Sequence, residues 1–319
     1  MKRPVAFITG IAGFAGSHLA EELLRCGYIV CGTLAPGESS SNLATIEKDI
    51  KLAELDILDA DRCRQVTLRL KPDYLFHLAA FASVGKSFAN ERLVYRVNFD
   101  GTLNLLAAAL RLKHLKKFIF VSSSDCYGVL SPKNKTLTEQ QPFNPISPYG
   151  ISKAAAEFAC LSYLKRFELP VTVARSFNHS GPRQSQDFVI PSFARQIALI
   201  EKKRSKPVIR VGDLSVKRDL SDVRDIVRGY RLLAQRGAVG QAYNLCSGKA
   251  VSIKSVLQRL IKLSKMKIDI VVDPALLRSS DIPVIRGDNT LAAKKLGYRS
   301  NYDLNETLQD TLDFFRQKT

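Results

Sequence analysis

Residues 5–16 read VAFITGIAGFAG, and this stretch decides the fold. A predicted strand over Val5–Thr9 leads directly into glycines with the spacing G-x-x-G-x-x-G, at Gly10, Gly13 and Gly16. Glycine suits these positions because the strand must turn tightly, the backbone must approach a pyrophosphate, and the next helix must pack closely on the sheet. A helix that begins there presents free N–H groups and its positive dipole end to phosphates. The stretch therefore predicts a dinucleotide-binding strand, turn and helix.

The first half of the chain continues this alternation of short apolar runs and longer amphipathic stretches. Because parallel strands joined by helices need right-handed crossovers, the pattern predicts an α/β fold with a doubly wound parallel (Rossmann) sheet. The expected strands are Val5–Thr9, Tyr28–Thr33, Lys51–Leu55, Tyr74–Ala79, Lys117–Ser122 and Val171–Phe177, and the expected helices cover about 14–26, 59–70, 91–112 and 147–167.

The pattern changes after about residue 178. Helices are expected near 188–203 and 222–236, strands near 207–211 and 241–245, and a terminal helix from Asn305. We therefore expect an NAD(P)-binding Rossmann domain over 1–177 and a smaller α+β substrate-binding domain over 178–319. Within the second domain, a segment near 215–245 is expected to return to the Rossmann sheet.

The composition is that of an ordinary globular protein with a strong positive charge. Hydrophobic residues make up 45% of the 319 residues and charged residues 24%, which excludes a disordered, collagenous or coiled-coil chain. Lysine and arginine outnumber aspartate and glutamate by 48 to 30, a formal net charge of +18. This charge favours an anionic partner, whether nucleic acid, a membrane surface or a phosphorylated small molecule. Runs such as Lys202–Arg204 and Lys116–Lys117 are interpreted as solvated surface.

Other sequence features bear on the compartment. No apolar run reaches 18 residues, so no membrane span is expected. The amino terminus lacks a long apolar core and a cleavage site, so secretion is not expected. The six cysteines lie at separate positions with no CxxC pair and no zinc-like spacing with histidine. We therefore expect buried thiols in a reducing cytoplasm, and no metal.

The end of the second predicted strand, Cys31–Leu34, bears on the choice of cofactor. An acidic residue there normally accepts hydrogen bonds from the ribose of NAD, and this stretch has none. An arginine for the 2′-phosphate of NADP is missing too, although serines follow at Ser39–Ser41. Because a carboxylate would repel that phosphate, its absence modestly favours NADP. Asp56, after the third strand, has two interpretations: it bonds the adenine amino group, or it caps the next helix.

Two further motifs suggest chemistry. Tyr149 and Lys153 stand four residues apart on a predicted helix, a spacing that places both side chains on one face. A neighbouring ammonium lowers the pKa of a tyrosine, which would let the pair exchange protons near neutral pH. The fifth strand runs into Ser122–Asp125, at the carboxyl edge where such folds bind ligands. A serine there would bond a substrate carbonyl; the alternative is a polar turn whose serines satisfy their own backbone.

Together these motifs resemble the extended short-chain dehydrogenase/reductase superfamily, in its group of NAD(P)-dependent sugar epimerases and dehydratases. The resemblance covers nearly the whole chain and also rests on His77–Ala80, on Asn98 with Gly101-Thr102, and on S-P-Y-G-I-S-K at 147–153. It implies NADP or NAD as cofactor. The residues implied to bind it are Gly10, Gly13, Phe14, Ala15, Gly16, Thr33, Asp56, Ile57, Leu78, Ala79, Ala80, Asn98, Val121, Tyr149, Lys153 and Phe177.

The resemblance also implies the roles of the catalytic residues. Ser123, five residues before Gly128, takes the place of the catalytic serine or threonine, beside Tyr149 and Lys153. Asp125 falls where nucleotide-sugar dehydratases carry an active-site glutamate, and its side chain is one methylene shorter.

Within the group, the stretch F-N-H-S-G-P at 177–182 resembles the branch that acts on GDP-mannose derivatives. Arg218 and Arg278 occupy places where that branch contacts the nucleotide diphosphate, a role that suits a guanidinium fork. The residues implied to bind substrate are Ser83, Ser124, Asn178, Arg183, Val189, Arg218, Arg278 and Asp281.

The implied reaction is the NAD(P)H-dependent reduction of the C4 ketone of a GDP-4-keto-6-deoxy-hexose. Two related reactions stay open, the 4,6-dehydration of GDP-mannose and the 4-epimerisation of a nucleotide sugar. A non-catalytic dinucleotide sensor that binds nucleic acid is disfavoured, because the chain keeps the Tyr/Lys pair and has no nucleic-acid-binding motif. The expected partners are a GDP-sugar and a second copy of the chain, which would form a homodimer through the helices near 91–112 and 147–167.

Overall fold

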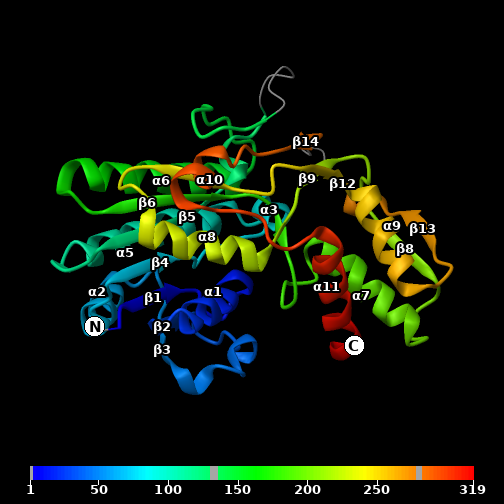
Figure 1. The fold of residues 1–319 in the computed structure, drawn as a ribbon, viewed down its shortest axis with the longest axis horizontal. Helices are drawn as coiled ribbons and strands as arrows, with labels where there is room; N and C mark the ends of the chain where they lie inside the picture. Colours follow the sequence, from blue (N-terminus) through cyan, green and yellow to red (C-terminus); the bar gives the residue numbers. More distant parts are fainter. Residues whose placement is uncertain (1–2, 130–135, 278–281) are drawn as a thin grey trace.

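A seven-stranded parallel sheet organises the computed structural model, which describes residues 3–129, 136–277 and 282–319 (Figure 1). The strand order is β11-β6-β5-β4-β1-β2-β3, so the order reverses beside β1. In such sheets, ligands bind at the carboxyl ends of the strands near this reversal. The fold class expected from the sequence is confirmed. The strands are β1 (Val5–Thr9), β2 (Ile29–Leu34), β3 (Ile50–Glu54), β4 (Tyr74–His77), β5 (Lys117–Ser123), β6 (Val171–Ser176) and β11 (Ala242–Leu245).

Helices cover both faces of this sheet and enclose two apolar cores. Helices α1 (Phe14–Arg25) and α8 (Val223–Arg236) pack together on one face. Helices α2 (Ala60–Leu70), α5 (Gly101–Ala109) and α6 (Pro148–Phe167) cover the other. The chain after residue 220 thus returns to the main sheet, where β11 pairs in parallel with β6.

The helix expected over 91–112 forms without a break over 91–109, but a π-helical turn interrupts its α-helical pattern. Helix α4 (Glu91–Tyr95) passes through a π-helical turn, η3 (Arg96–Asp100), into α5. The extra residue in this turn accompanies a side-chain contact, in which buried Asn98 bonds the backbone of Phe81 through both its amide atoms. Turns of this kind commonly mark functional sites, and they leave no signature in hydrophobic periodicity.

A third apolar core lies away from the main sheet. Helices α7 (Val189–Glu201), α9 (Ile253–Ser264) and α11 (Leu304–Lys318) pack together with strand β8 (Val208–Val211). Strand β13 (Asp269–Val272) pairs in parallel with β8 and is exposed. Helix α11 begins with a capping box formed by Asp303 and Glu306. The cap fixes its start one residue before the expected Asn305.

Shorter elements connect the two parts. They are α3 (Val84–Ser87), α10 (Thr290–Leu296), β7 (His179–Ser180), β9 (Lys217–Asp219), β10 (Ser221–Asp222), β12 (Ala250–Ser252), β14 (Val284–Ile285), and the 3₁₀ turns η1 (Ser41–Leu43), η2 (Glu47–Asp49), η4 (Ser124–Cys126) and η5 (Pro274–Leu276). Within the described ranges, no helix has both the length and the hydropathy needed to cross a membrane. All six cysteines are free thiols.

Candidate active site

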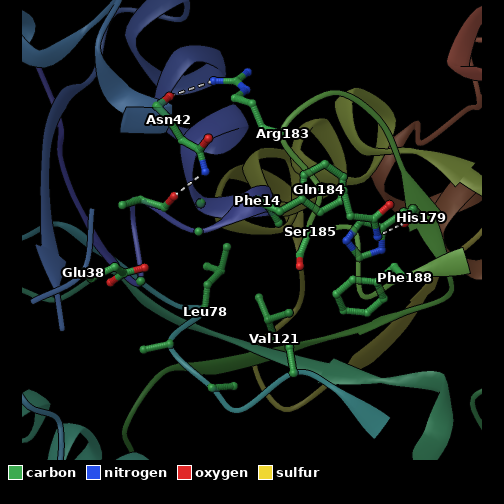
Figure 2. A pocket seen from close by; sticks show the side chains of 18 of the residues that line it. Phe14, Glu38, Asn42, Leu78, Val121, His179, Arg183, Gln184, Ser185 and Phe188 are labelled. Carbon is green, nitrogen blue, oxygen red and sulfur yellow. Dashed lines mark hydrogen bonds between the residues drawn. The ribbon is translucent and has the colours of Figure 1, made fainter. Parts of the chain in front are cut away.

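A cavity of about 1200 Å³ opens at the carboxyl ends of the central strands. One wall is the sheet edge from β2 to β6, and the opposite wall includes α7 and α11. Figure 2 shows side chains of the β1–α1 turn, the loop after β2 and the segment 179–188 converging on this space. The sites predicted for cofactor and for catalysis therefore share one cavity.

The glycine turn forms the floor of the cavity, and its geometry explains its composition. Gly10 has φ +69°, and a Cβ there would lie 3.0 Å from the backbone of Ala79. A Cβ on Gly16 would lie 2.1 Å from the carbonyl oxygen of Gly10. Gly13 is the N-cap of α1, and no side chain caps the free N–H groups of that first turn. The cradle and the open helix end fit a pyrophosphate.

The loop after β2 lines the same cavity and carries a carboxylate that sequence reasoning missed. Glu38 accepts a hydrogen bond from the backbone N–H of Ala35 at 2.9 Å. Asn42 donates to the carbonyl of Ala12 at 2.9 Å and so ties this loop to the glycine turn (Figure 2). Glu38 lies four residues beyond the end of the strand, after a Pro-Gly turn, and only the folded loop brings it to the cavity.

The two interpretations of Asp56 separate in the structure. Helix α2 is capped by Asp59, whose Oδ1 accepts from the backbone N–H of Arg62 at 2.8 Å. Asp56 Oδ1 accepts instead from the N–H of Leu58 at 2.9 Å, and Asp56 lines the cavity with Ile57. The capping interpretation of Asp56 is therefore wrong, and its position agrees with the cofactor role.

The loop after β4 is held by a chain of hydrogen bonds through buried His77. Thr9 Oγ1 lies 2.8 Å from Nδ1 of His77, and Thr102 Oγ1 lies 2.9 Å from Nε2. Since Thr102 donates its own proton to the carbonyl of Asn98, the imidazole carries its proton on Nε2. Burial lowers the pKa of His77 to about 3, so the ring is neutral. This chain fixes the backbone that presents Leu78, Ala79 and Ala80 to the cavity.

Helix α6 brings the candidate catalytic residues to the cavity, because its start is well defined. Ser147 is the N-cap and accepts from the N–H of Gly150 at 3.0 Å, and Pro148 takes the first helical position. The first turn of α6 therefore places Tyr149 on the cavity, and the next turn places Lys153 there.

Tyr149, Ser123 and Asp125 form a connected set. Ser123 Oγ donates to Asp125 Oδ2 at 2.8 Å, and both side chains act on the pKa of Tyr149. Burial raises the pKa of Tyr149, the charge of Asp125 raises it further, and the hydroxyl of Ser123 opposes both. The spacing of Tyr149 and Lys153 predicted a lowered pKa for the tyrosine, and this prediction is wrong.

The side chain of Lys153 is only 3% exposed. Its Nζ lies 4.6 Å from the centre of the Phe120 ring, and burial lowers its pKa to about 8. Lys153 therefore sits close to the point between its charged and neutral forms at the pH of most cells.

The structure brings together most of the predicted site residues. The cavity is lined by Gly10, Gly13, Phe14, Ala15, Gly16, Thr33, Asp56, Ile57, Leu78, Ala79, Ala80, Val121, Ser123, Ser124, Asp125, Tyr149, Lys153, Phe177, Asn178 and Arg183. Arg183, however, is bound to α1: it pairs with Glu21 at 2.7 Å and donates to His18 Nδ1 at 2.8 Å. The guanidinium thereby fastens the segment after β7 to the first helix.

Four predicted residues lie outside the cavity lining. Asn98 braces the loop after β4 from behind, and Ser83 caps α3 by accepting from the N–H of Lys86. Val189 begins α7 with its side chain 41% exposed. Arg218, on β9, donates to the carbonyl of Ile282 at 2.7 Å. Arg278 and Asp281 lie outside the described residues.

Three basic residues on the wall of the cavity were not predicted: Arg195 and Arg204, at and after helix α7, and Lys318 of α11. Arg204 bonds the carbonyl of Thr319. The run Lys202–Arg204 is exposed, as expected from the sequence, and Arg204 also borders the cavity. Lys117 is half-buried, and its Nζ donates to the carbonyl of Gly237, directly after α8, at 2.6 Å.

Comparisons with known proteins agree with this geometry. The family model described as GDP-mannose 4,6 dehydratase matches residues 7–311. A GDP-6-deoxy-D-mannose reductase of Pseudomonas aeruginosa is 32% identical over 306 residues, which cover 96% of this chain and 95% of the relative.

Two solved structures extend the likeness to the whole fold. One is described as RMD from Pseudomonas aeruginosa complexed with NADPH; it has a TM-score of 0.84 and 30% identity, with 99% of this chain and 100% of that chain covered. The other is a Thermus thermophilus UDP-glucose 4-epimerase in complex with NAD, with a TM-score of 0.87, 27% identity and the same coverage.

Proposed function

The chain belongs to the GDP-mannose 4,6 dehydratase family of NAD(P)-dependent nucleotide-sugar enzymes, and from this premise we propose that it is a reductase of the GDP-6-deoxy-D-mannose reductase type. The proposed reaction is the reduction of the C4 ketone of a GDP-4-keto-6-deoxy-hexose. The GDP-mannose 4,6-dehydratase and the nucleotide-sugar 4-epimerase are the alternatives that the experiment below must exclude.

The length and the hydrogen bond of the Asp125 side chain support the reductase over the dehydratase. A dehydratase needs an acid and a base at C5 and C6 of the sugar, and the resemblance places a glutamate at this position for that purpose. Here the side chain is a shorter aspartate, and its Oδ2 accepts the proton of Ser123 Oγ at 2.8 Å. A carboxylate engaged by the neighbouring serine supports ketone reduction, which needs no group at C5 or C6, better than elimination.

In the proposed reaction, Tyr149 and Ser123 have different roles at the C4 oxygen of the sugar. Tyr149 gives its proton to the oxygen that develops at C4, and its raised pKa keeps that proton in place until charge appears there. Ser123 donates a hydrogen bond to the same oxygen and stabilises its negative charge, so its bond to Asp125 must be exchanged when substrate binds. The nicotinamide cofactor, when bound, supplies the hydride.

Binding of the cofactor fits residues already described. We assign the pyrophosphate to the turn Gly10–Gly16 and the adenosine to the part of the cavity lined by Asp56. We assign to Lys153, in its charged form, a hydrogen bond to a ribose hydroxyl, since it lines the same cavity. The lack of an acid at the end of β2 favoured NADPH modestly. Glu38, in the loop after β2, also lines the cavity and supplies a carboxylate there, so NADPH is favoured less than the sequence of β2 suggested.

The test supplies purified protein with GDP-4-keto-6-deoxy-mannose and NADPH or NADH, and separately with GDP-mannose alone. Absorbance at the reduced-nicotinamide band follows the cofactor, and NMR identifies the sugar product. Cofactor oxidation with formation of a 6-deoxy-hexose supports the reductase. Without net cofactor use, conversion of GDP-mannose to the keto-sugar would overturn the proposal in favour of the dehydratase, and conversion to its C4 epimer would overturn it in favour of the epimerase.

We also propose that the protein acts as a homodimer in the cytoplasm. Apolar side chains lie exposed on two of the helices expected at the interface: Leu93 of α4 is 44% exposed, and Ile151 and Phe158 of α6 are 41% and 61% exposed. Burying such side chains between two copies would remove a large apolar area from water. The six free thiols support a reducing compartment.

A further inference from the structure

Helix α6 carries Tyr149 and Lys153, yet few large side chains hold it against the sheet. Its buried positions include Gly150, Ser152, Ala154, Ala156 and Cys160, all with small side chains. Small residues allow a close approach, but they offer no large side chain that would fix the rotation or depth of the helix. Another contact must therefore set the position of α6.

A buried ion pair supplies that contact. Glu157 lies on α6 one turn after Lys153 and is 0% exposed, and Arg175 lies on β6 and is 7% exposed. The guanidinium donates to Glu157 Oε1 from Nη2 at 2.7 Å and from Nε at 3.0 Å. Nε also lies 3.3 Å from Oε2, so the planar guanidinium contacts both carboxylate oxygens and restricts the distance and direction between helix and strand.

The same carboxylate also reaches the strand that carries the candidate catalytic serine. Ser122 Oγ donates to Glu157 Oε2 at 2.7 Å, and Ser122 precedes Ser123 on β5. In the sheet, Ser122 is the register partner of Arg175. Glu157 thus connects α6 to the neighbouring strands β5 and β6, next to the position of Ser123 on β5.

The network continues behind the ion pair to the edge of the sheet. Arg175 Nη1 donates to Tyr127 Oη at 2.9 Å, and Tyr127 Oη donates to Asn244 Oδ1 of β11 at 2.7 Å. The backbone N–H of Asn244 donates in turn to Glu139 at 2.8 Å. With its partners bonded in this way, the guanidinium has little freedom to follow a moving helix.

We propose that Glu157 and Arg175 are positioning residues, which hold α6 at the depth where Tyr149 and Ser123 meet the same substrate oxygen. A sub-ångström displacement of a proton donor is enough to slow a reaction strongly. Neither residue lines the cavity, so the loss of the pair should slow the chemical step and leave binding largely intact. The rate measurement rests on the proposed reductase function.

The first experiment separates positioning from stability. Replacing a buried ion pair by apolar side chains of similar volume often costs little stability, but here Ser122 and Tyr127 would lose their bonds to the pair. We therefore expect the double variant Glu157→Met/Arg175→Met to melt below wild type and to stay folded at the assay temperature. Its single-turnover rate with saturating keto-sugar should fall at least 30-fold, while the Kd of NAD(P)H and the KM of the sugar change less than threefold. A rate within twofold of wild type would overturn the proposal.

Two further variants keep the test decisive. Asp225→Asn breaks a buried carboxylate network on the other face of the sheet, where Asp225 pairs with Arg228 and binds the backbone N–H of Asn301. This control should unfold earlier than wild type and still react within twofold of its rate. If the double variant does not fold, Ser122→Ala removes one bond of Glu157 and should slow the reaction about fivefold; an unchanged rate there would count against the proposal.

Amide hydrogen exchange gives a readout that needs no turnover. In the double variant with NAD(P)H bound, amides of 150–160 should exchange at least tenfold faster than in wild type, while those of α8 stay unchanged. Equal protection would overturn the positioning role even if wild type fails to reduce the keto-sugar. Failure of wild type to turn over, with faster exchange in the variant, would overturn only the proposed function.

Discussion

At the scale of single residues, the chemistry depends on three side chains whose surroundings change their ordinary behaviour. Burial and Asp125 keep the proton on Tyr149, burial brings the pKa of Lys153 to about 8, and a turn after β2 carries Glu38 to the cavity. Each of these environments can be tested by one substitution.

Removing the phenolic oxygen should remove the proton donor and little else. We expect Tyr149→Phe to lower the rate by about 10²- to 10⁴-fold, the usual contribution of a positioned general acid, with the Kd of NAD(P)H within twofold of wild type. Tyr163→Phe is the matched control on the same helix, because Tyr163 packs against Phe167 outside the cavity lining. Stopped-flow kinetics measure both; an active Tyr149→Phe enzyme would contradict the assignment.

The charge of Lys153 predicts a pH limit. In the proposed mechanism its ammonium form holds the cofactor, and this form exists below a pKa of about 8, so activity should fall as pH rises through that value. The variant Lys153→Arg stays charged at any accessible pH, and its remaining activity should lack this limb. kcat/KM measured between pH 6 and 10 checks the result. If kcat/KM of Lys153→Arg falls at the same pH as that of wild type, the fall is caused by the titration of another group.

Glu38 should discourage a phosphate on the adenosine ribose. In Glu38→Gln, the amide oxygen can still accept the bond from Ala35, while the charge is gone. We expect the Kd of NADPH to fall about fivefold and the Kd of NADH to stay within twofold, because only NADPH carries the extra negative charge. Glu47→Gln, in the nearby turn η2, is the control. Equal effects on both cofactors would show that Glu38 does not face the ribose.

At the scale of elements, hydrogen bonds between loops and helices shape the site more than apolar packing does. His77 joins β1, β4 and α5, and Asn98 in the π-helical turn joins the loop after β4 to α6, where it donates to Ser152 at 2.9 Å. Both residues were recognised in the sequence as parts of motifs. Their role here is to support the backbone that faces the cofactor.

His77 should make stability depend on pH. Its folded pKa of about 3 lies below the ordinary value of 6.5, so the unfolded chain binds the proton first. The stability that neutral His77 contributes is complete above pH 6.5 and is lost as pH falls toward 3. We expect the drop in melting temperature between pH 7 and 5 to be smaller in His77→Gln than in wild type. Exposed His114 provides the control, since His114→Gln should keep the wild-type drop.

At the scale of the whole molecule, the sheet and the third apolar core leave between them one long cavity with basic residues on its wall. Arg195, Arg204 and Lys318 lie there, so part of the +18 charge faces the ligands. A positive wall raises the local concentration of anionic substrates. The net charge thus has a use in the cavity, which the composition alone could not assign.

The proposed dimer belongs to this scale as well. Phe158→Glu would place a charge in the apolar face of α6 and should shift the protein to a monomer in sedimentation experiments. Val239→Glu, at an exposed apolar side chain next to β11, should leave the mass unchanged. A wild-type protein that sediments as a monomer at micromolar concentration would contradict the dimer itself.

The residues alone were enough to predict the fold class, the glycine turn and the Tyr149/Lys153 spacing, and the family resemblance implied Ser123. These features are local: strand and helix periods, a turn that only glycine fits, and an i,i+4 pair all lie within a few residues of one another. Even Asp59, which caps α2, was within reach of the same reasoning.

Only the tertiary structure decided the rest, because it depends on contacts between distant segments. Periodicity could not show the π-helical turn at Asn98, which accompanies a bond to Phe81, nor the turn of Arg204 toward α11. The raised pKa of Tyr149 follows from burial, and the spacing between Tyr149 and Lys153 in the sequence does not show how deeply the tyrosine is buried. The pairing of Glu157 with Arg175, 18 residues later in the sequence, exists because β6 lies beneath α6. Desolvation and long-range hydrogen bonds are properties of the assembled molecule, and they set the chemistry of a site whose parts the sequence already names.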